Sequence, residues 1–123
     1  MVNSRKKGNV GERQVIKILS KYFPGKFERR SMGVAGSDIV TPDKFDFAVE
    51  VKYHKTVKAF HLLIGKNKLL NTWWKQAEQQ AEGTTKSPLL IVKCEGKWFC
   101  TEFCPAKVGH WLLLEDWCQH PLP

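Results

Sequence analysis

The spacing of apolar residues predicts two long helices on either side of a strand-rich segment. A helix is expected over residues 8–23, where apolar side chains recur at intervals of three and four, namely Val15, Ile18, Leu19 and Tyr22. The sequence FPG ends this pattern with a proline and a glycine. A second helical region includes residues 69–82, ends at Gly83, and has an apolar face of Leu70, Trp73, Trp74, Ala77 and Ala81.

Shorter apolar segments predict strands. Three are expected at 26–32, 37–41 and 45–53, separated by glycines and by the turn sequence TPDK. Residues 88–95 and 97–103 flank Gly96 as a hairpin, and residues 109–118 predict a short tail helix, amphipathic or buried. The order αβββαββα indicates an α/β (α+β) fold, in which helices pack on one mixed sheet.

Length and composition are consistent with one compact domain spanning residues 1–123, with a tail rich in Cys and Trp from 104 to 123. The chain has 123 residues, of which 42% are hydrophobic, and no apolar segment long enough for a membrane helix. The basic N-terminus has no apolar segment after it, so we expect a cytoplasmic protein without a secretion signal. Its four cysteines are then expected to be reduced thiols.

The cysteine spacing leaves a zinc site as an open alternative. The gaps between Cys94, Cys100, Cys104 and Cys118 do not show paired knuckle spacing, although His110 or His120 could complete a site. Small buried thiols are the simpler interpretation.

Charge is distributed unevenly along this chain of net charge +8. Residues 1–30 hold nine Lys or Arg and two acids, and residues 53–75 hold five Lys and no acid. Between them, residues 31–52 hold two Lys and four acids. Basic segments on both sides of an acidic one favour a nucleic-acid surface around a cation site, because phosphates attract Lys and Arg whereas a metal requires carboxylates.

The acidic segment carries the candidate chemistry. Glu50 and Lys52 are two residues apart on a predicted strand, so their side chains project from one face. If the preceding turn centres on Lys44, Asp38 lies opposite Glu50 with the Cβ atoms about 5 Å apart. Two carboxylates at that separation share a proton or bind a divalent cation such as Mg²⁺, and Lys52 then contacts a phosphate oxygen or a water.

Two further polar residues adjoin apolar helix faces. Glu12 lies at the upper end of the face of the first helix, aimed at the sheet, although an acid near a helix N-terminus also favours the helix dipole. Gln76 is three residues after Trp73 on the second helix and is expected to reach the sheet, unless it is simply exposed.

Together these residues resemble the PD-(D/E)xK nuclease superfamily, in particular the archaeal-type Holliday junction resolvases and their bacteriophage relatives. The resemblance covers residues 5–103. It rests on Glu12 in KGNVGER, Asp38 in GSDI, the VEVK segment and Gln76 in WWKQAEQQA, in that order. The proline that often precedes the first Asp of the family is Ser37 here, and the tail from Cys104 onward has no counterpart.

The resemblance implies a restriction-endonuclease-like core and a site of known type. Metal ligands would be Asp38, Glu50, the Val51 carbonyl and Glu12, binding Mg²⁺ or in its place Mn²⁺, with Lys52 and Gln76 as further catalytic residues. Phosphate contacts would come from Arg5, Lys6, Lys7, Arg29, Arg30 and Ser31. Members are homodimers that cut branched DNA, so a cytoplasmic, nucleoid-associated and phage-encoded enzyme is implied.

Two other functions remain open on the sequence. A metal site specifies hydrolysis and not DNA shape, so a restriction-like, repair or nicking endonuclease has the same residues. A non-catalytic basic protein that binds nucleic acid would instead pair Asp38 and Glu50 with neighbouring Lys and Arg.

Overall fold

The computed structural model describes residues 4–31, 36–64, 67–105 and 110–119, with side chains in the first helix from Val10 onward. Its elements, in chain order, are α1 (Ser4–Tyr22), β1 (Glu28–Arg29), β2 (Ile39–Val40), β3 (Phe47–Tyr53), α2 (Ala59–Ile64), α3 (Lys68–Ala81), β4 (Ser87–Cys94), β5 (Lys97–Thr101), β6 (Leu112–Leu113) and α4 (Leu114–Gln119). No helix in the described ranges is long and apolar enough to cross a membrane.

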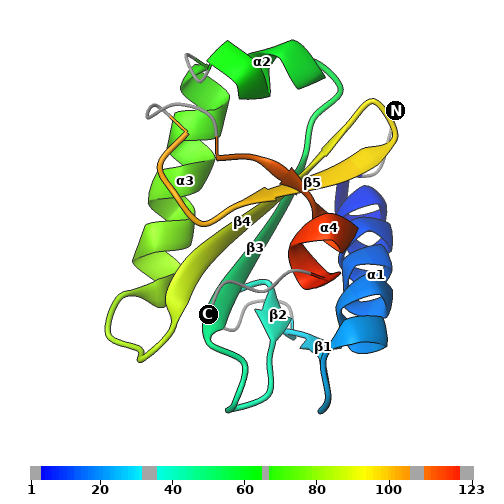
Figure 1. The fold of residues 1–123 in the computed structure, drawn as a ribbon, viewed down its shortest axis with the longest axis vertical. Coiled ribbons are helices and arrows are strands. Elements are labelled where there is room, and N and C mark those ends of the chain that lie inside the picture. Colours follow the sequence, from blue (N-terminus) through cyan, green and yellow to red (C-terminus); the bar gives the residue numbers. More distant parts are fainter. Residues whose placement is uncertain (1–3, 32–35, 65–66, 106–109, 120–123) are drawn as a thin grey trace.

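The main sheet is mixed and has four strands in the order β3-β4-β5-β6. Strand β3 runs parallel to β4, as a crossover through helices requires, and the remaining pairs are antiparallel. The α/β prediction is therefore confirmed, and the arrangement is compatible with a restriction-endonuclease-like fold (Figure 1). Strand β3 is an edge strand of this sheet, which leaves one side of its backbone available to other groups.

The expected hairpin between residues 37–41 and 45–53 is wrong. Strand β2 pairs antiparallel with β1, in a separate two-stranded sheet, and not with β3. The connection turns sharply instead, because the Phe45 N–H donates to the Pro42 carbonyl at 2.9 Å. Asp38 therefore does not lie opposite Glu50 in a strand ladder, although it still reaches β3 through its side chain.

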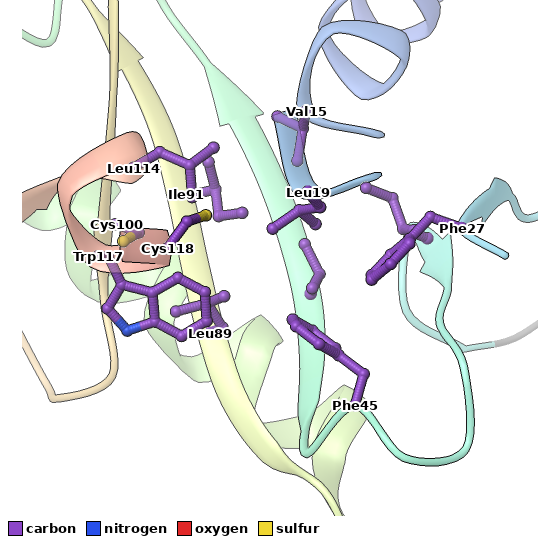
Figure 2. Close-up of a cluster of buried hydrophobic side chains, with 12 residues drawn as sticks. Val15, Leu19, Phe27, Phe45, Leu89, Ile91, Cys100, Leu114, Trp117 and Cys118 are labelled. Atoms are coloured by element: carbon purple, nitrogen blue, oxygen red, sulfur yellow. The ribbon is translucent and has the colours of Figure 1, made fainter. Parts of the chain in front are cut away.

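Two apolar clusters cover the two faces of the main sheet. Helices α1 and α4 pack on the face of Val49, Leu89 and Ile91, where Trp117 also lies (Figure 2). Helix α3 packs on the opposite face against Leu90 and Val92. Alternation along the strands thus sends successive residues into different clusters, as expected for a sheet with both faces covered.

The ends of several elements follow sequence signals. Helix α3 begins after Asn67, whose side chain accepts from the Leu70 N–H at 3.1 Å, and ends before Gly83, whose φ is 79°. The β4–β5 hairpin turns at Glu95 and Gly96, both with positive φ, as predicted. Helix α1 ends at Tyr22, one residue before the predicted end, and it begins at Ser4, four residues earlier than predicted.

The C-terminal region differs from the predicted single helix over 109–118. Residue 109 lies outside the described ranges, Leu112–Leu113 form β6, and α4 begins only at Leu114. Leu114 and Trp117 are buried in the core, and the Trp117 indole donates to Glu102 at 2.9 Å. This part of the tail therefore completes the α1 face of the sheet. Two short elements, α2 and β6, have no counterpart in the predicted order.

The cysteines are free thiols and are divided between the two sides of the sheet. Cys100 and Cys118 belong to the cluster under α1 and α4, whereas Cys94 belongs to the cluster under α3. Burial raises the pKa of the Cys94 thiol to about 11, which disfavours the thiolate that zinc requires. The four sulfur atoms do not converge, so the zinc alternative has no site in the described part of the chain.

Candidate functional site

Asp38 meets strand β3 at its open edge. The Val51 N–H donates to Asp38 Oδ2 at 2.9 Å, so the carboxylate occupies the position that a neighbouring strand would take. In an extended strand the N–H and C=O of one residue point to the same side, so the Val51 carbonyl faces the same edge. A carboxylate and a carbonyl oxygen are thereby brought together.

Glu50 and Lys52 project from one face of β3, as predicted. Their register partners on the parallel strand are Leu90 and Val92, which contact α3, so both side chains are on the α3 side of the sheet. Glu50 is only 4% exposed, and its Oε2 lies 3.9 Å from the Lys52 ammonium. A carboxylate buried in a protein interior is costly unless a cation neutralises it, and one lysine at this distance does so only in part.

The acids of this edge hold their protons more tightly than ordinary carboxyls. Burial, and then the neighbouring Asp38 charge, raise the pKa of Glu50 to about 7, despite the opposing effect of Lys52. Burial also raises the pKa of Asp38, although the bond from Val51 opposes it. The two groups therefore form a coupled pair whose ionised form requires additional positive charge.

Glu12 approaches the pair from α1, on the other side of the sheet. Burial and then the charge of Asp38 raise the pKa of Glu12. Its Oε2 accepts from the Arg29 guanidinium at 3.4 Å, so Arg29 already partly neutralises it. The influence of the Asp38 charge on Glu12 agrees with the prediction that this acid is aimed at the sheet, whereas its role as a metal ligand stays a prediction.

Arg30 fixes the backbone that carries Asp38. Its Nε donates to the Ser37 carbonyl at 2.6 Å, and its own N–H donates to the Asp38 carbonyl at 3.1 Å. Gly36 has a φ of 128°, and a Cβ there would lie 2.6 Å from the Arg30 guanidinium carbon. Only glycine accommodates both this backbone conformation and this contact.

Lys86 holds the turn between β2 and β3, and the sequence offered no indication of it. Its ammonium donates to Thr41 Oγ1 at 2.8 Å and to the carbonyls of Pro42 and Phe45 at 2.8 and 2.7 Å. All three acceptors lie between β2, which begins directly after Asp38, and β3, which carries Glu50. Lys86 therefore positions the two carboxylates relative to one another without touching either.

The remaining predicted residues are less closely tied to the acidic pair. Gln76 lies on α3, which covers the face of Glu50, and its Oε1 is buried without a hydrogen-bond partner among the described residues. Ser31 is exposed. The side chains of Arg5, Lys6 and Lys7 lie outside the described set. Phosphate contact by these residues, Arg29 and Arg30 stays a prediction.

The oxygen donors at this edge fit a hard divalent cation. The described residues contain no group of three or more His, Cys, Asp or Glu side chains that could hold a metal. An ion would therefore rest on the Asp38 and Glu50 carboxylates with the Val51 carbonyl. Mg²⁺ suits such a set, because it uses one or two carboxylates and completes its octahedron with water and phosphate oxygens.

Comparison with protein families agrees with this geometry. The profile of the family described as "Phage putative PDDEXK endonuclease" matches residues 3–103, which include Glu12, Asp38, Glu50 and Lys52. Neither the curated proteins nor the solved structures contain a match. The matched region spans every element from α1 to β5, and the acidic pair with its lysine lies inside it. The chain therefore belongs to this family of phage PD-(D/E)xK endonucleases.

Proposed function

We propose that this protein is a metal-dependent endonuclease that hydrolyses phosphodiester bonds in DNA at the Asp38–Glu50 edge. The observation that carries the proposal is the buried Glu50 carboxyl beside Asp38, because burial first, and then the Asp38 charge, raise the pKa of Glu50 to about 7. An acidic pair of this kind is unfavourable by itself but suits a divalent cation. Family membership supports the same chemistry.

The residues of the chain have distinct tasks in this proposal. Asp38, Glu50 and the Val51 carbonyl would hold Mg²⁺, which supplies polarisation of the phosphate and a more acidic bound water. Lys52, held 3.9 Å from Glu50, would orient the attacking water and stabilise the negative charge that develops on phosphate oxygens. Arg29, Arg30 and the basic start of α1 would bind the flanking phosphates.

The preferred substrate within this proposal is a four-way DNA junction, cut by a homodimer. Each chain contributes one Asp38–Glu50 site, and paired incisions in opposed strands require two sites related by a two-fold axis. The resemblance to junction resolvases supports this substrate, and action in the cytoplasm of an infected cell fits a phage nuclease. Flap or duplex cleavage would place the protein in another class of nuclease with the same site.

Cleavage of end-labelled junction, flap and linear duplex, with Mg²⁺ and with EDTA, tests the proposal. Symmetric nicks in the junction alone, lost in EDTA and in Glu50→Ala, are expected. Asp38→Asn should also abolish cleavage, whereas Asp43→Asn, an exposed aspartate of the neighbouring turn, serves as the matched control and should retain it. Cleavage by Glu50→Ala at the wild-type rate would refute the site.

Lys52 is tested separately, through the rate of the chemical step. Lys52→Ala is expected to lower single-turnover cleavage by about 100-fold or more while leaving DNA affinity nearly unchanged. A loss of affinity alone would make Lys52 a phosphate contact. Binding without cleavage of any substrate, in any metal, would favour a binding protein that has no nuclease activity.

A further inference from the structure

Helix α2 exposes apolar side chains that the nuclease site does not use. Phe60, Leu63 and Ile64 are 56%, 76% and 55% exposed, although they make up half of this six-residue helix. We call these three residues the α2 tip. Val57 and Leu62 are buried beside it in the cluster under α3, so the segment is anchored to the core while the tip faces outward. Exposed apolar groups in this arrangement mark a contact surface.

The tip is held in a defined conformation. The His61 ring lies 4.1 Å from the Phe60 ring, centroid to centroid, and its Nδ1 accepts from the Lys58 N–H at 2.9 Å. The Ala59 N–H donates to the Glu95 carboxylate at 3.3 Å, which ties the start of the helix to the β4–β5 turn. An ordered aromatic tip loses little conformational entropy when it binds.

The surroundings of the tip are strongly basic. No Asp or Glu occurs in residues 51–77, whereas lysines occur at 52, 55, 58, 66, 68 and 75. Lys55, Lys58 and Lys68 are exposed on either side of the tip. One acid, Glu95, accepts a hydrogen bond from the Ala59 N–H at the start of α2. A polyanion matches this charge, whereas a second copy of the same surface would bring lysines together across a two-fold axis.

The tip also lies close in sequence to the site residues of β3. Strand β3 carries Glu50 and Lys52 and leads at its carboxyl end into α2, as Figure 1 shows. Only Tyr53 and a short connection, residues 54–58, separate Lys52 from the helix. A nucleic acid that reaches Lys52 from this end of β3 therefore meets the α2 tip next.

We propose that the α2 tip inserts Phe60 and Leu63 against unstacked bases at the branch point of DNA bound in the neighbouring site. Apolar side chains gain from burial against bases only where stacking is interrupted, and basic residues around them bind the phosphates. The tip would thus select branched over continuous duplex DNA. This inference rests on the proposed action on branched DNA and names the element that recognises the branch.

Binding in EDTA tests the inference without cleavage. The probe is a four-way junction of synthetic strands with 2-aminopurine beside the branch point, together with a linear duplex of the same sequence. Phe60→Ala and Leu63→Ala should each weaken junction binding about tenfold and suppress the rise in 2-aminopurine fluorescence, with little change for the duplex. Phe60→Trp, which keeps an aromatic ring, should retain both signals.

Phe103 is a matched control for Phe60. It is 48% exposed and its ring also lies against a histidine, His110, at 4.7 Å, but it is on the segment after β5. Phe103→Ala should leave junction binding unchanged. Thermal unfolding of each variant tests whether the fold is retained. We expect it to be, because the substituted side chains of the tip are exposed.

Three outcomes would overturn the inference. If Phe60→Ala and Leu63→Ala bind the junction with unchanged affinity, the tip does not contact the DNA. If both variants lose the same affinity for junction and for duplex, the tip does not recognise the branch. If light scattering showed a lower molecular mass for Phe60→Ala or Leu63→Ala than for the wild type, the tip would contact a second copy of the chain and not DNA. Failure of wild-type protein to cut any DNA would refute the proposed function, while the binding result would still decide the role of the tip.

Discussion

Replacing Glu50 with glutamine should stabilise the metal-free protein at alkaline pH, although it removes an ion pair. Glu50 is buried beside Asp38, and burial and this neighbour outweigh the attraction of Lys52 in its pKa. Glutamine has nearly the same shape and carries no charge, so it imitates the protonated carboxyl. The variant therefore removes the cost of ionisation and keeps most of the packing.

The magnitude follows from the pKa of Glu50 in the folded protein, which is about 7 against an ordinary value of 4.5. Between these values the folded state binds a proton that the unfolded state has released, so wild-type stability falls as the pH rises through this window. At about 1.4 kcal/mol for each pH unit, the free energy of unfolding that is lost because Glu50 ionises in the folded protein approaches about 3 kcal/mol above pH 7. The advantage of Glu50→Gln should be below about 1 kcal/mol at pH 5 and grow by about 2 kcal/mol by pH 8.

Urea unfolding in EDTA at pH 5, 6, 7 and 8 measures this difference. Glu78→Gln, an exposed glutamate on α3, is the matched control and should show a difference that does not change with pH. Added Mg²⁺ should stabilise the wild type and have a smaller effect on Glu50→Gln, because the proposed site would bind the ion through the native carboxylate. A difference independent of pH, or a variant less stable than wild type at pH 8, would refute the assignment of Glu50 as a buried, unneutralised acid.

Three further predictions concern the geometry and protonation of the site. Lys86→Met should lower the free energy of unfolding by about 2–3 kcal/mol and slow cleavage more than it weakens DNA binding, because three acceptors between Asp38 and Glu50 lose their donor. Urea unfolding and single-turnover kinetics measure the two effects, and a loss of stability with an unchanged cleavage rate would contradict the prediction. Gly36→Ala should lower the free energy of unfolding by about 1–2 kcal/mol and reduce cleavage, since it strains a backbone with a φ of 128° and displaces Arg30. Its control is Gly83→Ala, at a positive φ with no atom within 4 Å of the added Cβ, which should destabilise the fold without affecting cleavage. At low Mg²⁺, the cleavage rate should rise with pH through about 7 as Glu50 ionises, and higher Mg²⁺ should move the midpoint of this pH profile to lower pH because the ion competes with the proton. A midpoint that does not depend on Mg²⁺ concentration would show that Glu50 does not take part in metal binding.

Local periodicity was sufficient to predict much of this fold. The apolar spacing of α1 and α3 was visible in the sequence because each helix repeats its buried face every turn. The β4–β5 hairpin was visible because Gly96 supports its turn. The shared face of Glu50 and Lys52 required only that residues 47–53 form a strand, since side chains two apart project together. Each of these features depends on residues close in sequence.

Contacts between distant residues were decided only by the tertiary structure. The sequence placed Asp38 beside Glu50, but by a hairpin that does not form; the proximity comes instead from the bond that the Val51 N–H donates to the Asp38 side chain. Lys86 binds acceptors more than 40 residues earlier in the chain, so no local pattern could indicate it. The exposure of the α2 tip likewise depends on where the core ends, because an apolar hexapeptide is equally suited to a buried helix. The sequence by itself thus determined which residues are candidates for the chemistry, and packing determined how they meet.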